Sequence, residues 1–147
     1  MTDLHGTLAI AASALSAERL RLDVIAANLA NASTTRTAAG GPYRRRDVVL
    51  APADLESDFA DTLAALGDAA HQPGVHAVGV VEDPSPPRLV YDPGHPDADA
   101  QGYVAYPNVN PILEMVDLTT ATRAYEANVQ VMNATKRLAD VALQIGS

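Results

Sequence analysis

Residues 4–32 read LHGTLAIAASALSAERLRLDVIAANLANA, and this stretch decides the fold. It contains no proline and only one glycine, and its leucines recur at every seventh residue: Leu8, Leu15, Leu22 and Leu29. The alternate positions of the stripe hold Ala11, Glu18 and Ile25, and beside them lie Ala12, Arg19 and Ala26. A seven-residue repeat keeps one face against a partner helix, so the stretch predicts a long amphipathic helix. At about 1.5 Å per residue it extends roughly 35 to 40 Å, more than a small core requires.

A second stretch with the same spacing closes the chain. Between Pro111 and Gly146 there is neither glycine nor proline. One row of this stretch holds Met115, Thr122, Val129, Lys136 and Leu143, and the next holds Leu118, Tyr125, Met132 and Ala139. Because lone helices are marginal in water, each needs a partner. We therefore expect an α+β fold in which long N- and C-terminal helices pack as a coiled-coil-like pair.

The middle of the chain is rich in β-branched residues and proline. The first helix should stop near Ala32, because three hydroxyl residues and Gly40-Gly41-Pro42 follow it. Extended segments are predicted over residues 43–50, 75–82, 88–91 and 103–106. Residues 84–87, PSPP, turn the chain between the second and third of these, which we expect to run antiparallel. Leucine spacing over residues 55–66 suggests a short helix.

These patterns divide the chain into three parts. Residues 1–35 form the N-terminal helix of an inner helical domain, residues 36–110 a small β-rich unit, and residues 111–147 the C-terminal helix. From Asp47 to Asp99 the acids face only one base, Arg88, whereas the ends are nearly neutral. We expect the acidic middle to face water and the ends to face protein.

Composition excludes several classes of function. A net charge of −8 opposes binding to nucleic acid or anionic lipid. Only 4% of residues are aromatic and much of the apolar content is alanine, so the core should be thin. Without cysteine there is no disulfide, thiolate metal site or thiol nucleophile. No run of about eighteen apolar residues predicts a membrane span. The first thirty residues lack the features of a cleaved leader.

The terminal stripes are the strongest candidates for a functional surface. One interpretation is an intramolecular helix pair that closes a monomer. The other is packing between subunits, since helices at the chain ends present apolar faces that neighbouring copies can cover. The residues expected to pack between subunits are Leu8, Leu15, Leu22, Ile25, Asn28, Leu29, Asn31, Met115, Leu118, Tyr125, Asn128, Val129, Met132 and Leu143.

Two polar motifs have a structural and a functional interpretation. Residues 28–31, NLAN, stop the first helix, or else their amides fix the following loop against a neighbour. Residues 44–46, three arginines, form a solvated strand edge, or else they contact acids of an adjacent subunit. Such contacts would set register more than affinity.

No catalytic, cofactor or metal site is expected. Residues 97–102, DADAQG, imitate the start of a calcium loop, but the twelfth position is Asn108 and prolines flank the segment, which favours a turn. His5, His71, His76 and His95 lack helical metal-ligand spacing, and a site joining the last three with Asp92 is less economical than a solvated loop. No serine lies in a nucleophile elbow and no glycine loop could cradle phosphate.

Taken together, the sequence resembles the flagellar axial family of rod and hook proteins, and within it the proximal-rod branch. The N-terminal part of the resemblance lies in SALSAERL (residues 13–20) and VIAANLAN (residues 24–31). The central part lies in LVYDPGHP (residues 89–96), AD (98–99), GYV (102–104) and PNV (107–109). The C-terminal part lies in EMV (residues 114–116) and RAYEAN (residues 123–128). Residues 51–74 carry the least of it.

The resemblance implies a structural subunit and no enzyme. Its partners would be other proximal and distal rod subunits, further copies of itself, the rod-to-ring junction and the flagellar type III export machinery, with no nucleic acid and no small-molecule substrate. It would lie in the periplasmic rod of the basal body, as part of a torque-transmitting shaft. It would be exported unfolded, without a cleaved signal peptide.

Two other functions stay open on the sequence. The helices could close on each other in a self-contained binding module. A metal-dependent hydrolase built around residues 92–99 is a third hypothesis, and it predicts measurable metal retention.

Overall fold

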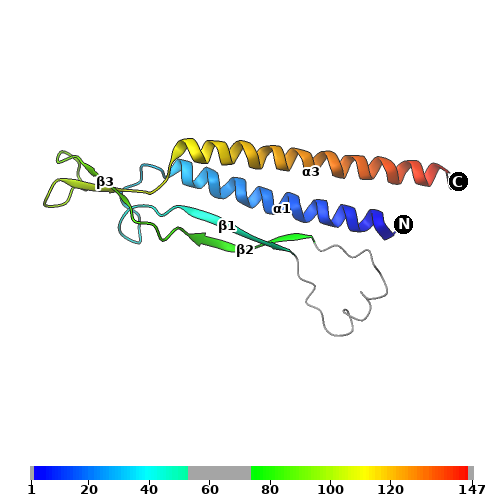
Figure 1. Ribbon diagram of the computed structural model, residues 1–147, viewed down its shortest axis with the longest axis horizontal. Helices are drawn as coiled ribbons and strands as arrows, with labels where there is room; N and C mark the ends of the chain where they lie inside the picture. Colours follow the sequence, from blue (N-terminus) through cyan, green and yellow to red (C-terminus); the bar gives the residue numbers. More distant parts are fainter. Residues whose placement is uncertain (1, 53–73, 146–147) are drawn as a thin grey trace, which may run out of the picture.

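The computed structural model describes residues 2–52 and 74–145. Two long helices, α1 (Thr2–Ala30) and α3 (Pro111–Ile145), run antiparallel and side by side, so that α1 begins and α3 ends at the same end of an elongated molecule (Figure 1). The predicted α+β fold with a terminal helix pair is confirmed. None of the described helices is long and apolar enough to span a bilayer.

Both helices have ends that the sequence explains. Asn110 caps α3, because its side-chain oxygen accepts the backbone N–H groups of Ile112 at 3.0 Å and Leu113 at 3.4 Å. Pro111 follows at the first helical position, where a missing N–H removes no bond. Asn31 ends α1: its amide donates to the carbonyl of Ala27 at 2.9 Å. The Oδ1 of the same side chain accepts the Thr34 hydroxyl at 3.1 Å.

The β-rich region forms two separate antiparallel ribbons. Strand β1 (Arg46–Pro52) pairs with β2 (Val75–Glu82), and β3 (Arg88–Tyr91) pairs with β4 (Tyr103–Tyr106). The predicted strands are present, but the expectation that residues 75–82 and 88–91 flank a turn as an antiparallel pair is wrong. Prolines fix φ and lack an N–H, so residues 84–87 carry the chain on toward the far end of the molecule (Figure 1).

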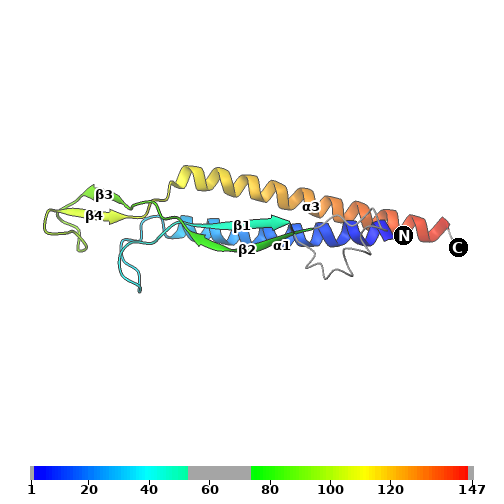
Figure 2. The same cartoon turned by 60° about the horizontal axis from the view of Figure 1, so that its bottom comes forward.

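The β1–β2 ribbon lies along α1, as Figures 1 and 2 both show. Ser13 ties the two together: its hydroxyl accepts the backbone N–H of Val75 at 3.1 Å and donates to the carbonyl of Ile10 at 2.8 Å. Gly74 allows this approach, because a Cβ there would lie 2.5 Å from the Ser13 oxygen. The ribbon therefore depends on a close backbone-to-helix contact.

The β3–β4 ribbon extends beyond the helix pair (Figure 2). Val104 at its centre is fully buried, and Tyr91 and Tyr103 meet edge to face at 5.3 Å. Gly102 has a φ of 84°, and a Cβ there would lie 2.9 Å from the Tyr91 ring, so only glycine fits. The Thr35 hydroxyl donates to Asp97 at 2.8 Å and links the β3–β4 loop to the segment after α1.

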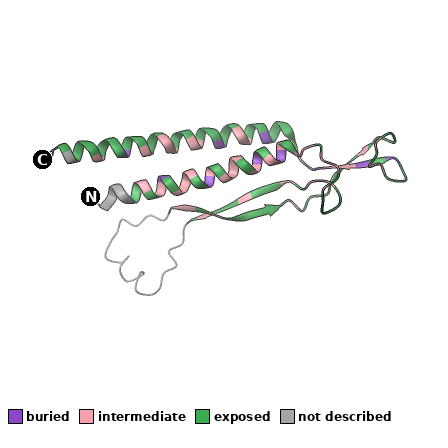
Figure 3. Cartoon of the chain, turned by 180° about the vertical axis from the view of Figure 1, so that it is seen from behind, coloured by how far each residue is buried: buried purple, intermediate pink, exposed green. Residues whose placement is uncertain are grey.

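The core is thin, as the composition predicts. Its buried apolar members within the described residues are Ala11, Ala17, Ile25, Val104 and Ala121. Much of α3 is exposed along its length (Figure 3). The predicted helix over residues 55–66 lies outside the described residues.

Candidate assembly site

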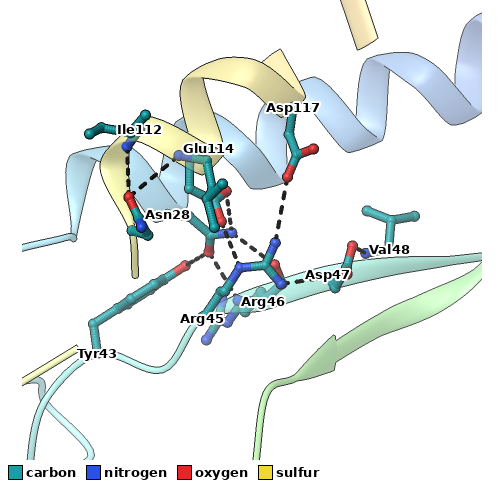
Figure 4. Close-up of polar contacts among 11 residues, drawn as sticks. Asn28, Tyr43, Arg45, Arg46, Asp47, Val48, Ile112, Glu114 and Asp117 are labelled. Atoms are coloured by element: carbon teal, nitrogen blue, oxygen red, sulfur yellow. Dashed lines mark hydrogen bonds and ion pairs between the residues drawn. The ribbon is translucent and has the colours of Figure 1, made fainter. Parts of the chain in front are cut away.

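A polar cluster joins α1, α3 and β1 near the start of α3. We call it the junction cluster, and its members are Asn28, Tyr43, Arg45, Arg46 and Glu114 (Figure 4). Glu114 and Asn28 are almost completely buried, with 1% and 0% of their surface exposed. Buried polar groups are destabilising unless they are paired, so the arrangement of their partners decides whether the cluster is tenable.

Asn28, on α1, bonds to β1, to α3 and to Tyr43. Its amide donates to the carbonyl of Arg46 at 2.8 Å and to Glu114 Oε2 at 3.1 Å. Its Oδ1 accepts the backbone N–H of Arg46 at 2.9 Å and the Tyr43 hydroxyl at 3.0 Å. An asparagine amide has two donors and two acceptor positions, and here all are used. Asn28 therefore lies within the helix and pairs with the strand as a backbone group would.

Glu114 is held by a charge-assisted bond. Arg45 donates through Nε to Glu114 Oε1 at 2.6 Å, and its other nitrogens lie 3.5 Å from Asp47 and 3.9 Å from Asp117. Burial acts to lower the pKa of Arg45, but the bond and charge of Glu114, with Asp47, outweigh it and leave the pKa above its usual value. The position of Glu114 in the first turn of α3 also favours its negative charge.

Tyr43 completes the cluster from the loop before β1. Burial raises the pKa of its phenol; nearby Arg46 opposes that effect, and Glu114 and Glu82 reinforce it. The phenol is therefore a donor to Asn28 over the physiological range.

The three arginines divide between two roles. Arg45 and Arg46 pair with acids of their own chain, Arg46 with Glu82 across the β1–β2 ribbon at 3.3 Å. Arg44 is exposed. If the triplet contacts an adjacent subunit, Arg44 is the one arginine of the three whose side chain has no ion pair with the residues that the structure describes.

The predicted packing residues fall into four groups. Ile25 and Asn28 are buried, and Met115 is 58% exposed. The half-buried members are Leu8, Leu15, Leu22, Leu29, Asn31, Leu118, Tyr125, Asn128, Val129 and Met132. The side chain of Leu143 lies outside the described residues. The leucine stripe of α1 and the Leu118 row of α3 are thus partly covered, whereas Met115 at the start of the other row is exposed.

The most buried row of α3 lies one residue before the Met115 row. It holds Glu114, Ala121, Asn128 and Thr135, of which Asn128 is half-buried and the others are buried. A search for large apolar residues misses this row because its members are small or polar. In the facing stripe of α1, Glu18 Oε2 is buried without a hydrogen-bond partner among the described residues. The seam is therefore narrow and lined largely by small or polar groups.

A second stripe of α3 is left uncovered by the part of the chain that the structure describes. We call it the α3 outer stripe; its members recur every three or four residues and all are exposed: Leu113, Val116, Thr120, Arg123, Ala127, Val131, Ala134, Leu138 and Val141. Of its large apolar members, Leu138 has the largest exposed fraction, at 64%. At about 100° per residue the stripe lies roughly a third of a turn from the row that faces α1. The sequence-based predictions did not include it, although its spacing could have revealed it.

The candidate metal and calcium residues have other partners. Asp99 accepts the backbone N–H groups of Gln101 and Tyr103, and Asp97 accepts the Thr35 hydroxyl, so residues 97–102 form a turn. Among the described residues no three histidines or acids come together as a metal site. His5 and His71 lie outside the side chains that the structure describes.

Comparison with known proteins places this architecture. Residues 8–36 match the family model "Flagella basal body rod protein", and residues 100–145 match "Flagellar basal body rod FlgEFG protein C-terminal". These two matches cover most of α1 and the whole of α3, the helices joined by the junction cluster.

Three relatives share almost the whole length of the chain. Each is named flagellar basal-body rod protein FlgC. The Bacillus subtilis protein is 47% identical over 99% of both chains, the Borreliella burgdorferi protein 42% over 97% of both, and the Salmonella typhimurium protein 43% over 93% of both. With its paired terminal helices and its similarity to these proteins over nearly the whole chain, the chain belongs to the FlgC family of flagellar basal-body rod proteins, which are structural subunits and not enzymes.

Proposed function

We propose that this rod subunit assembles through the outward faces of its terminal helices, and that the junction cluster sets the direction in which its β ribbons project. The observation that carries the proposal is the α3 outer stripe. Five of its nine members are large aliphatic residues that stay exposed in the single chain. Exposed apolar stripes of this kind mark protein contacts.

The proposal gives the ends and the middle of the chain different places in the rod. Residues 1–35 and 111–147 form the inner helical domain that packs between subunits, and residues 36–110 form the outer part. Of the packing residues predicted from sequence, Met115 and the half-buried Val129 and Met132 can still contact a neighbour at their exposed edges.

The junction cluster supports this role because it joins the two parts rigidly. Asn28 and Glu114 lie on the helices, and Arg45 and Arg46 begin the path into the β1–β2 ribbon. A shaft that transmits torque needs inner and outer parts that turn together. Several buried, mutually satisfied hydrogen bonds fix one geometry where apolar contacts alone would allow sliding.

The family also suggests partners and a location. We infer that the neighbours are proximal and distal rod subunits, further copies of this chain and the rod-to-ring junction, within the periplasm. We infer further that the flagellar type III apparatus exports the unfolded chain without cleaving a leader. The thin core is compatible with such a route, because a chain with little buried area is easier to unfold.

Replacement of Leu138 by aspartate tests the proposal. Because Leu138 is exposed, the monomer should keep its fold, while incorporation into basal bodies of a host lacking its own copy should fall at least tenfold. Asn133→Asp is the matched control, since it adds the same charge at an exposed position outside the outer stripe. Equal incorporation of both variants would count against the proposal.

The self-contained binding module also has an observation in its favour, because the helices do pack together within one chain. Hydrogen exchange on the purified monomer separates the two functions. Slow exchange along the whole of both helices favours the module, whereas fast exchange away from the junction cluster favours a subunit completed by its neighbours.

A further inference from the structure

The uncovered face of α1 carries small side chains at helix-packing spacing. We call it the α1 outer face; its members lie three or four residues apart and all are exposed: Ala9, Ala12, Ser16, Arg19, Asp23, Ala26 and Ala30. No large apolar side chain is exposed in the described part of α1. Short side chains let another helix approach closely, provided that helix supplies large ones.

The α3 outer stripe supplies large side chains and the opposite charge. The stripe exposes large side chains, whereas the α1 outer face exposes mostly small ones. These large side chains include Leu113, Val116, Val131 and Leu138. Asp23 lies within one face and Arg123 within the other, and neither makes an ion pair with any residue that the structure describes. The two faces thus differ in side-chain size, and Asp23 and Arg123 supply one pair of opposite charges across them, with Arg19 of the α1 outer face one turn from Asp23.

These two faces cannot meet within one chain, because α1 and α3 already contact each other through different rows. In an array whose copies all point the same way, α1 of one copy and α3 of the next run antiparallel. With Asp23 opposite Arg123 in that orientation, four more members of the α1 outer face lie level with members of the α3 outer stripe, and Ala9 and Ser16 are each one residue out of level. Ala30 then lies level with Val116, Ala26 with Thr120, and Ala12 with Ala134.

We propose that the α1 outer face of one copy packs against the α3 outer stripe of a second copy, in the antiparallel register set by Asp23 and Arg123. This rests on the proposed assembly through the terminal helices and names the surface and the partner. The contact is heterologous, since it joins two different surfaces, so each copy keeps one of each for further neighbours.

The register also implies a stagger between copies. Within a chain Asn28 bonds to Glu114, so these residues are level. Between copies Asn28 would be level with Leu118, an offset of four residues or roughly 6 Å along the helices. A heterologous contact with such an offset climbs at each repeat and builds a helical array.

Cysteine cross-linking tests this contact cleanly, because the chain has no cysteine of its own. Full-length A12C/A134C chain would replace the host's own copy, and isolated basal bodies would be mildly oxidised. Disulfides need Cα atoms about 4.4 to 6.8 Å apart. The proposed contact brings residues 12 and 134 of adjacent copies level on facing surfaces, whereas within one chain they lie on faces that do not meet. We expect a ladder of joined copies. The control A12C/N133C, with Asn133 on the other flank of α3, should give at least tenfold less product.

Exchange of the two charges is the second measurement. Asp23→Arg and Arg123→Asp should each lower incorporation at least threefold, and the D23R/R123D chain should recover at least half of the normal amount. If either change lowered incorporation only by disturbing the fold, adding the other change would not restore incorporation.

The outcomes separate the two proposals. If the unmodified chain is not incorporated into rods, the proposed assembly fails. If it is incorporated but A12C/A134C joins no copies, or joins only a different rod protein, the copy-to-copy contact is wrong while the assembly stands. If the A12C/A134C chain is excluded from rods, the charge exchange decides. The contact is wrong if D23R/R123D does not recover incorporation, and it is supported if D23R/R123D does.

Discussion

At the scale of single residues, Glu114 holds a negative charge where 1% of its side chain meets solvent. It is tolerable there because Arg45 and Asn28 satisfy both carboxylate oxygens. A buried pair of this kind contributes less to stability than to a defined geometry, since its desolvation offsets much of its attraction. The loss of one partner is nevertheless destabilising, which makes the cluster open to direct tests.

Replacement of Glu114 by glutamine should lower the free energy of unfolding of the monomer by about 2 kcal/mol, because Arg45 loses its charged partner inside the cluster. Chemical denaturation measures it. Asp117→Asn is the control: this carboxylate is 41% exposed and 3.9 Å from Arg45, so its loss should change stability by less than about 0.5 kcal/mol. Equal effects of the two changes would show that burial of Glu114 is unimportant.

Because of Tyr43, the free energy of unfolding should depend on pH in the alkaline range. The pKa of Tyr43 in the folded chain is raised above 10.0 by burial, so the fold favours the protonated phenol. That contribution is complete below the unfolded value and is lost as pH rises through the folded value. Denaturation between about pH 8 and about pH 11 should show the fall, and Tyr43→Phe should remove this part of it while lowering stability by about 1 kcal/mol at neutral pH. An unchanged pH profile in the variant would contradict this assignment.

At the scale of elements, the β1–β2 ribbon packs along α1 and its backbone closely approaches the helix at Gly74, so its attachment should be sensitive to one methyl group there. Gly74→Ala places a Cβ 2.5 Å from the Ser13 oxygen, which is already bonded on two sides. We expect a loss of about 1 to 3 kcal/mol in unfolding free energy, measured by thermal or chemical denaturation.

Gly79→Ala is the control within the same ribbon, because nothing lies within 4 Å of a Cβ built there. It should change stability by less than about 0.5 kcal/mol. Addition of Ser13→Ala to Gly74→Ala should relieve part of the loss, and strictly additive effects would show that the two residues do not meet in solution.

At the scale of the whole molecule, two aliphatic side chains should separate folding from assembly. Ile25 of α1 is one of the few buried apolar side chains among the described residues, so Ile25→Ala should lower monomer stability by about 2 to 4 kcal/mol. Leu138 points away from the pair, so Leu138→Ala should leave monomer stability within about 0.5 kcal/mol and yet weaken incorporation into rods. Denaturation and basal-body composition together measure both; a stable monomer with Ile25→Ala would mean that the helix pair does not hold the chain together.

Local sequence determined the elements of this protein. Unbroken seven-residue spacing predicted both terminal helices, and β-branched runs bounded by proline and glycine predicted the strands, because helix and strand periodicity depend on neighbouring residues alone. The thin core likewise follows from composition. The motifs at both ends also carried the family resemblance.

Tertiary structure alone decided which elements pair and which faces stay open. Nothing local shows that residues 75–82 pair with β1, since strand pairing depends on where the whole chain travels. From sequence, Asn28 could stop the helix, fix the following loop against a neighbour or pack between subunits, and Glu114 has no predicted role. Their meeting across 86 positions of sequence needs the antiparallel helices to be in place first. Periodicity also cannot tell an inner row from an outer one, because a stripe is buried or exposed only by what lies against it.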